Sequence, residues 1–263
     1  MPLEPVIARA DLHFWEEPSI SGKNGSGTIF FSGCPLSCVF CQNYEVSHNG
    51  VGRKISINAL SDIFKELEEK NAHNINLVTP THYSLAIKQA LDIYRPKIPI
   101  VYNCSGYESA ETLKMLEDYI DIYLFDFKYI SSDKADRFSS APDYPEVAMS
   151  ALKEAYRQRG KCLFDKEGIM KSGVIIRHLL MPQATNDAIK IFDIVRSGFN
   201  NAYFSLMSQY IPFGEAGNIY PINRKVTKRE YEKVVSYIAK AGFENCYIQQ
   251  LSSADEKYIP DFG

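Results

Sequence analysis

The sequence predicts an α/β protein, more specifically a partial (β/α)6 TIM-type barrel that is laterally open. Two observations support this prediction. Short β-rich runs, several of them continuously apolar, alternate with amphipathic helical stretches along the chain. Six such strand–helix units fall short of the eight that close a barrel, and a doubly wound sheet is the alternative. In either architecture, functional side chains are expected at the carboxyl ends of the parallel strands.

The individual elements follow from local patterns. Ser109 and Thr227 stand at expected helix starts, and Glu230 follows Thr227 at capping-box spacing. Strands are expected at 27–33, 74–79, 98–103, 121–128, 173–181 and 201–208, with a short seventh run at 246–251. Helices are expected at 58–69, 83–94, 109–118, 145–159, 186–197 and 227–241. We expect one domain, with an N-terminal extension (1–26), a barrel core (27–212) and a C-terminal helix with a closing segment (213–263).

Composition excludes several classes of protein. The chain has 263 residues, of which 45% are hydrophobic, and its net charge is −3, so it is neither a disordered nor a fibrous chain. A protein with this net charge has no strong overall electrostatic attraction to nucleic acid or to an anionic membrane. No apolar run approaches the roughly 20 residues of a membrane span, and the first residues lack a secretory pattern. We therefore expect a cytoplasmic protein with no nucleic-acid or membrane partner.

A cluster of cysteines follows the first expected strand. Cys34, Cys38 and Cys41 are spaced C-x3-C-x2-C in a loop that contains Gly33 and Pro35. Three thiolates at this spacing can hold three corners of one iron–sulfur cubane. One iron would then lack a protein ligand, and an open position of this kind is where chemistry occurs in catalytic metal sites.

Three other interpretations of this cluster are open. Buried cysteines can be small apolar residues that serve only packing. A structural zinc site would need a fourth ligand, for which His48 and Cys104 are candidates. Cys38 and Cys41 also have the C-x-x-C spacing of a redox thiol pair.

The cysteine loop resembles that of the radical S-adenosylmethionine (SAM) superfamily. The shared features are the spacing, the aromatic Phe40 before the last cysteine, and the position after the first strand of an α/β chain. The stretches 102–107 (YNCSGY), 126–128 (DFK) and 176–182 (IRHLLMP) resemble the pyruvate formate-lyase activating enzyme branch of this superfamily. The resemblance runs from about Thr28 to Pro212 and is strongest at the cysteine loop.

The resemblance implies a specific chemistry. The three cysteines would hold a [4Fe-4S] cluster, and SAM would bind the fourth iron. One electron from a flavodoxin or ferredoxin-type reductant would cleave SAM to methionine and a 5′-deoxyadenosyl radical, which abstracts a hydrogen atom. In the activase version, the target is a glycine of a partner glycyl-radical enzyme. The alternatives are a peptide, RNA or small-molecule substrate, or a non-catalytic Fe-S or zinc protein.

Strand alternation orients several candidate residues. Ile122, Leu124, Asp126 and Lys128 share one face of their strand, which turns from apolar to charged at its carboxyl end. The resemblance implies that Asp126 and Lys128 help to place SAM, with Lys128 near its carboxylate. Adjacent residues on a strand point to opposite faces, and the resemblance favours an inward Arg177 that pairs with a carboxylate. His178 would then be a structural residue beneath a helix.

Other candidates come from the remaining strand ends. Asn103 and Ser105 share a face and match a polar pair that lines the SAM site in the resembled family, although turn capping explains them nearly as well. Many relatives carry Gly-Gly-Glu-Pro after the second strand, where this chain has 78–82 (VTPTH) and no carboxylate. The predicted cofactor-binding set is Thr79, Thr81, Asn103, Ser105, Asp126, Lys128, Arg177 and Gln209. Gln209 stands near the place where some activases have a histidine, so pyruvate formate-lyase itself is a doubtful target.

Overall fold

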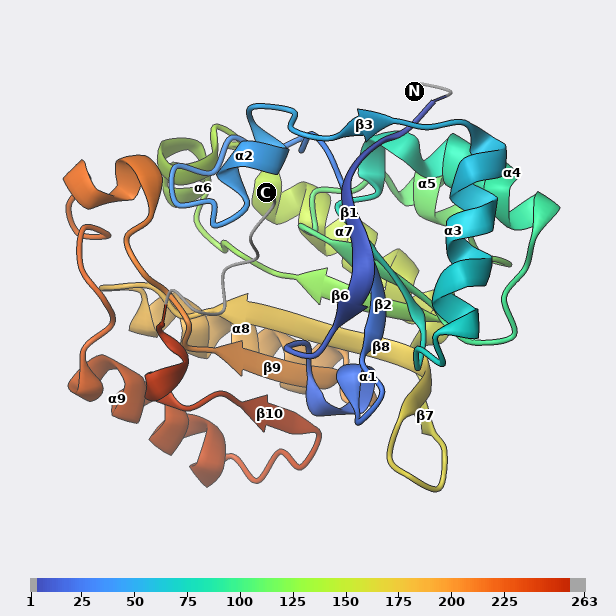
Figure 1. The fold of residues 1–263 in the computed structure, drawn as a ribbon. Helices are drawn as coiled ribbons and strands as arrows, with labels where there is room; N and C mark the ends of the chain where they lie inside the picture. The colour runs from blue at the N-terminus through green and yellow to red at the C-terminus, as the bar shows by residue number, and fades with distance from the viewer. Residues whose placement is uncertain (1–3, 256–263) are drawn as a thin grey trace.

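The computed structural model describes residues 4–255, and its centre is a mostly parallel, open sheet (Figure 1). The strand order is β10-β9-β8-β6-β5-β4-β2-β1-β3, and the run from β2 to β10 is parallel throughout. The strands are β1 (Val6–His13), β2 (Ser26–Phe31), β3 (Arg53–Lys54), β4 (Ile75–Val78), β5 (Ile100–Cys104), β6 (Ile122–Asp126), β7 (Leu163–Phe164), β8 (Met170–Leu179), β9 (Tyr203–Met207) and β10 (Cys246–Ile248).

Helices connect these strands, and most of the longer ones cover the outer face of the sheet (Figure 1). The helices are α1 (Pro18–Ser21), α2 (Tyr44–Ser47), α3 (Ile57–Glu69), α4 (Ser84–Ile93), α5 (Ala110–Met115), α6 (Ser132–Ser139), α7 (Tyr144–Arg159), α8 (Thr185–Gly198) and α9 (Lys228–Lys240). Short 3₁₀ turns are η1 (Thr81–Tyr83), η2 (Gly214–Asn218) and η3 (Leu251–Ser253). None of the helices between residues 4 and 255 is long and apolar enough to cross a membrane.

The predicted open α/β fold is confirmed. Each of the six expected barrel strands overlaps an observed parallel strand, and the short run at 246–251 contains β10, which extends the sheet beside β9. Several elements were not predicted, namely β1, which pairs antiparallel with β2, the short strands β3 and β7, and the helices α1, α2 and α6. The expected N-terminal extension thus contributes a strand to the sheet, and residues 256–263 of the expected closing segment lie outside the described residues.

Strand register separates an inner from an outer face. Val101 pairs with Ile122, and Leu124 pairs with Ile175, so these residues lie on one face. They form a buried apolar cluster that includes Ile20 of α1, which closes the bottom of the barrel. The opposite face packs its buried side chains against the helices in a larger apolar core. Above the inner cluster, the same face carries the polar side chains at the strand ends.

The start of α9 has the predicted capping box. The Thr227 hydroxyl accepts a hydrogen bond from the Glu230 backbone N–H, and the Glu230 carboxylate accepts one from the Thr227 N–H. Because these bonds satisfy two otherwise unpaired donors, Thr227→Ala should lower the free energy of unfolding by about 1 kcal/mol. Urea denaturation measures this change, and Thr227→Ser, which keeps the hydroxyl, should stay close to wild type. Equal loss in both variants would contradict the capping explanation.

Candidate functional site

The three predicted cysteines lie together in the loop after β2, at the carboxyl end of the parallel strands. Gly33 begins this loop with a φ of +89°, in the region that favours glycine, and its N–H donates to Val46. A Cβ at this position would lie 3.0 Å from the His82 ring nitrogen Nε2. The positive φ lets the chain turn sharply from the buried strand into the loop that carries the thiols.

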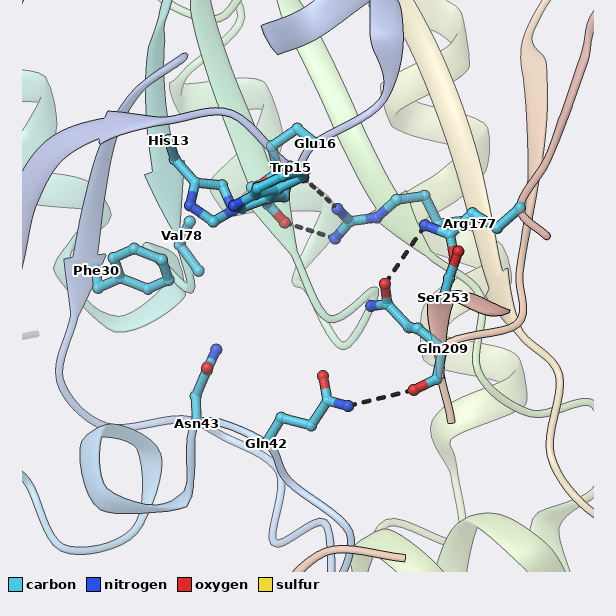
Figure 2. Close-up of a pocket in the computed structure, with 12 residues that line it drawn as sticks. His13, Trp15, Glu16, Phe30, Gln42, Asn43, Val78, Arg177, Gln209 and Ser253 are labelled. Carbon is cyan, nitrogen blue, oxygen red and sulfur yellow. Dashed lines mark hydrogen bonds and ion pairs between the residues drawn. The ribbon is translucent and has the colours of Figure 1, made fainter. Parts of the chain in front are cut away.

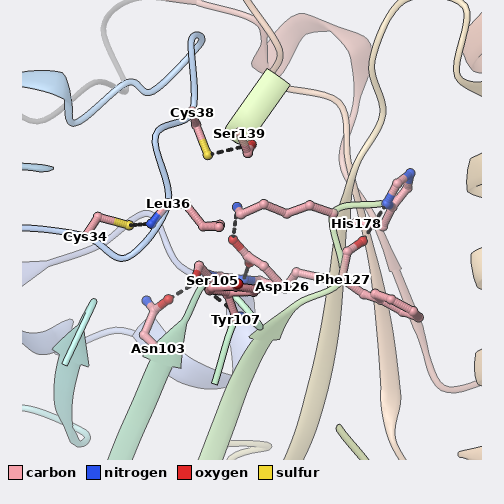
Figure 3. A network of polar contacts seen from close by, with 12 residues as sticks. Cys34, Leu36, Cys38, Asn103, Ser105, Tyr107, Asp126, Phe127, Ser139 and His178 are labelled. Carbon is pink, nitrogen blue, oxygen red and sulfur yellow. Dashed lines mark hydrogen bonds and ion pairs between the residues drawn. The ribbon is translucent and has the colours of Figure 1, made fainter. Parts of the chain in front are cut away.

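Each thiol has a hydrogen-bond partner within the fold, and Figure 3 shows those of Cys34 and Cys38. The Cys34 Sγ accepts from the Leu36 N–H at 3.5 Å. The Cys38 Sγ lies 3.0 Å from the Ser139 Oγ, and the Cys41 Sγ lies 3.1 Å from a serine hydroxyl of α2. Hydrogen bonds of this kind orient metal ligands and tune iron–sulfur centres.

The helix α6, which was not predicted, helps to hold this loop. The carbonyl oxygens of Phe138 and Ser139 accept hydrogen bonds from the Val39 and Ser37 N–H groups at 3.0 and 3.2 Å. Burial raises the pKa of the Cys34 thiol to about 12, whereas the charge of Lys128 opposes this effect. Metal binding requires thiolates, so iron would displace these protons when it binds.

The donor set fits an iron–sulfur cluster held by the three cysteines. Among residues 4–255, no three His, Cys, Asp or Glu side chains are arranged to hold one metal ion. His48 stacks on Tyr44 with its Nδ1 2.7 Å from the hydroxyl of Ser47, and Cys104 is buried in the core behind the sheet. Cys104 is therefore remote from the loop, whereas His48 contacts Cys41 only through the Ser47 hydroxyl. Three sulfur donors from one loop, each with its own hydrogen bond, suit separate corners of one cluster.

A buried ionic network lies on the inner face beside the cysteine loop. The Arg177 guanidinium donates to Asp126 through Nε at 2.8 Å, to Glu16 through Nη1 at 3.1 Å and to the Asn103 oxygen through Nη2 at 2.6 Å. The Lys128 Nζ donates to the other Asp126 oxygen at 2.6 Å. Two cations thus face two carboxylates, all of them at most 20% exposed. The network fixes these groups before any ligand arrives.

The charges in this network stabilise one another. Burial alone would raise the pKa of Asp126, but the adjacent Arg177 and Lys128 outweigh it and lower that pKa. Burial likewise disfavours the charged form of Lys128, yet Asp126 and the Cys38 thiol raise its pKa. Both cations and the aspartate therefore stay charged at neutral pH.

Two adjacent cavities are lined by residues of this network. A cavity of about 190 Å³ is lined by Cys38 and Cys41 together with the charged side chains of Asp126, Lys128 and Arg177. Its remaining wall is mostly apolar and consists of Phe40, Leu179, Met207, Tyr210 and Ile211, with the amides Gln42, Asn43 and Gln209. We call this the cysteine cavity.

A second cavity, of about 290 Å³, is also lined by Arg177 but by none of the cysteines (Figure 2). Its aromatic side chains are His13, Trp15 and Phe30, and Glu16 is its carboxylate. Its polar lining also includes Gln42, Asn43, Asn103, Gln209, Gln249 and Ser253. We call this the outer cavity. The two cavities share Gln42, Asn43, Arg177 and Gln209, so they lie next to one another.

The structure places the predicted residues in two groups. Asn103, Asp126, Lys128, Arg177 and Gln209 line the two cavities. Thr79, Thr81 and Ser105 line neither of them. The Thr81 hydroxyl donates to Glu108, and the Ser105 Oγ accepts from the Tyr107 N–H within its own turn.

The adjacent pair on β8 divides as expected. Arg177 faces inward, and His178 lies 2% exposed on the other face, where its Nδ1 is 2.8 Å from the Phe127 carbonyl oxygen. A carbonyl only accepts, so Nδ1 carries the proton. Burial lowers the pKa of His178 and keeps its ring neutral.

Glu16 and Asn76 were missed by the sequence analysis. The Glu16 Oε1 accepts from the Asn76 and Asn103 amides at 3.0 and 3.1 Å, which fixes its other oxygen toward Arg177. A signal existed, because apolar and polar residues alternate from Ala8 to His13, as in a half-buried strand just before Glu16.

Glu108 is a buried carboxyl group behind the β4–η1 turn. It accepts hydrogen bonds from the Thr81 hydroxyl at 2.6 Å and the Tyr102 hydroxyl at 2.9 Å, and burial raises its pKa from 4.5 to about 7. Between these two pH values, Glu108 is therefore protonated in the folded state but ionised in the unfolded state. As the pH rises from 4.5 to 7, the free energy of unfolding of the wild type should therefore fall by about 3 kcal/mol more than that of Glu108→Gln.

Urea denaturation at several pH values tests this expectation. Above pH 7 the difference between wild type and Glu108→Gln should become constant, because both states of the wild type are then ionised. The exposed Glu111 of the following helix α5 provides the matched control, and between pH 4.5 and 7 Glu111→Gln should follow the wild-type pH profile. Parallel profiles for wild type and Glu108→Gln would show that Glu108 does not titrate in this way.

Comparisons with known proteins agree with this geometry. The family model described as the radical SAM superfamily matches residues 28–192. The uncharacterized protein MJ0674 of Methanocaldococcus jannaschii is 32% identical over 245 residues, which cover 90% of this chain and 68% of that protein.

Two solved structures match this chain. The crystal structure of HydG, a maturase of the [FeFe]-hydrogenase, has a TM-score of 0.51 at 14% identity, over 80% of this chain and 47% of HydG. Methylornithine synthase (PylB) has a TM-score of 0.49 at 13% identity, over 81% of this chain and 62% of PylB. The chain thus spans less than two thirds of either structure, and the HydG likeness concerns the fold alone.

Proposed function

Because this chain belongs to the radical SAM superfamily, we propose that it cleaves SAM reductively and uses the resulting radical to abstract a hydrogen atom. The observation that carries this proposal is the cysteine cavity, where two of the three loop cysteines share a space with Asp126, Lys128 and Arg177. Sulfur ligands and charged partners for a zwitterionic ligand therefore face each other across one cavity.

The three cysteines would hold the [4Fe-4S] cluster, which, when bound, supplies one electron to SAM at its open iron. The chain's own residues position SAM. Arg177 and Lys128 are fixed by Asp126 and can pair with the methionine carboxylate. The apolar side chains of the cysteine cavity, among them Phe40 and Leu179, offer a surface for the adenine ring.

The outer cavity would then receive the hydrogen donor. It adjoins the cysteine cavity at Arg177 and Gln209, so a radical formed in the first cavity would lie close to the second. Arg177 and Glu16 cancel one another's charge, and the remaining polar groups are mostly amides, which both donate and accept hydrogen bonds. This lining favours an uncharged donor group rich in hydrogen-bonding atoms.

The experiment is anaerobic reconstitution with iron and sulfide, followed by reduction with dithionite in the presence of SAM. We expect 5′-deoxyadenosine and methionine to form in equal amounts, as measured by mass spectrometry. Asp126→Asn, which leaves Arg177 and Lys128 without their shared carboxylate, should slow this reaction. Reconstituted protein that carries iron but forms no 5′-deoxyadenosine would contradict the proposal.

Glycyl-radical activation is the second candidate, and the amide-rich outer cavity supports it because amides can bind an extended peptide backbone. The donor would be the Cα of a glycine in a partner enzyme, and the electron would come from a flavodoxin or ferredoxin-type reductant in a reducing cytoplasm. The matched family model covers the superfamily and does not single out this branch.

Incubation with SAM, reductant and glycyl-radical enzymes from the same organism tests this version. A glycyl-radical signal in electron paramagnetic resonance would support it. Abundant 5′-deoxyadenosine without any glycyl radical would instead indicate a peptide, RNA or small-molecule donor.

A further inference from the structure

A third cavity, of about 240 Å³, lies between the loops that follow β6 and β8 and the segment 220–222. Lys128 and Leu179 line both this cavity and the cysteine cavity, so these two side chains stand between the two spaces. We call it the rim cavity. None of the functions discussed above uses it.

The walls of the rim cavity are mainly apolar. They consist of Tyr129, Phe138, Leu179, Met181, Pro182, Ala184, Tyr220, Pro221 and Ile222. The ring of His178 also lines it and is neutral, because its Nδ1 donates to the Phe127 carbonyl and burial lowers its pKa (Figure 3). An apolar body of modest size therefore fits the interior without leaving a buried charge unpaired.

The charges at the rim do not cancel. The Lys134 Nζ pairs with Asp187 at 2.6 Å, and the Lys128 Nζ pairs with Asp126. Arg137 differs, because no carboxylate of residues 4–255 lies within ion-pair distance of its guanidinium.

The fold fixes the position of this unpaired cation. The Arg137 guanidinium lies 5.2 Å from the centre of the Phe138 ring, and its Nη2 donates to the Tyr220 carbonyl oxygen at 2.5 Å. Phe138 and Tyr220 both line the rim cavity, so the charge stands at its edge. The remaining N–H groups of Arg137 can donate hydrogen bonds to both oxygens of one carboxylate.

The geometry points to a binding site for an apolar carboxylate, with its hydrocarbon body among the apolar side chains of the rim cavity and its carboxylate on Arg137. The site is coupled to the cysteine loop, because Phe138 and Ser139 of the same helix bond to Val39, Ser37 and Cys38. A ligand on this helix would thus hold the end of α6 that supports the loop. This inference needs neither the cluster nor SAM and does not depend on the proposed function.

Isothermal titration calorimetry of the reconstituted protein tests the site with 3-phenylpropanoate as the probe. The matched neutral and cationic probes are 3-phenylpropanamide and 3-phenylpropylamine, which keep the same apolar body. We expect the carboxylate to bind at least fivefold more tightly than the amide, and the amine to bind most weakly. Arg137→Gln, an exposed position, should remove the preference for the carboxylate, while Ala184→Phe should fill the cavity and abolish binding.

Arg95→Gln provides the control, because Arg95 is a surface arginine that does not line the rim cavity. It should leave the affinity for 3-phenylpropanoate unchanged. Equal affinity for the carboxylate and the amide, binding that survives Ala184→Phe, or no binding at millimolar concentration would each overturn the inference.

Discussion

Cys38→Ala should abolish iron–sulfur cluster assembly and SAM cleavage while the chain remains folded. Cys38 is 7% exposed, lines the cysteine cavity and is held against Ser139, so its sulfur has one fixed position. With two sulfur ligands left in the loop, the cluster would lose one of its three protein-held corners. We expect the yield of 5′-deoxyadenosine to fall at least a hundredfold, together with the iron content.

The matched control for this prediction is Cys246→Ala. Cys246 is a half-buried free cysteine on β10, outside the cysteine loop and outside both cavities of the site. This variant should assemble the cluster and cleave SAM at the wild-type rate. If Cys246→Ala lost as much iron as Cys38→Ala, the loop would not be the specific cluster site.

Arg177→Ala should have the second large effect, on both SAM binding and stability. Arg177 holds Asp126, Glu16 and the Asn103 amide at once, and its side chain is 11% exposed. Its removal leaves two buried carboxylates short of a partner, which typically costs about 3–5 kcal/mol. We expect SAM affinity to fall about a hundredfold, or about 2.7 kcal/mol, with the iron content of folded protein unchanged.

Two further variants separate binding from folding in this experiment. Arg177→Lys keeps one positive charge and should recover much of the stability, but not the three-way hydrogen bonding that orients the site. Arg196→Ala removes an exposed arginine that pairs with Asp193. It should leave both the SAM affinity and the free energy of unfolding unchanged. Loss of cluster absorbance in folded Arg177→Ala would contradict the expectation that Arg177 acts on SAM binding and not on cluster assembly.

The sequence was sufficient for those features that depend on local pattern. The parallel strands were predictable because buried strands are continuous apolar runs, and the alternation along β6 placed Asp126 and Lys128 at the polar end of the inner face. Alternation also required Arg177 and His178 to face opposite ways, although the choice of Arg177 as the inward residue came from the family resemblance.

The features that were missed depend on contacts distant in sequence. Glu16 joins the site only because β1 pairs with β2, which brings its carboxylate to Arg177. The helix α6 is short and strongly polar, so its apolar residues were too few to give a clear period. The Thr81 hydroxyl is directed at Glu108, a partner 27 positions away that no local pattern reveals.

Electron paramagnetic resonance of the dithionite-reduced protein, with and without SAM, tests the central claim most directly. The claim is that the three loop cysteines leave one cluster iron open to SAM. The account predicts about four irons per chain and a reduced-cluster signal whose g values shift when SAM is added. A signal that SAM leaves unchanged, or a chain that binds one zinc ion and gives no signal, would contradict it.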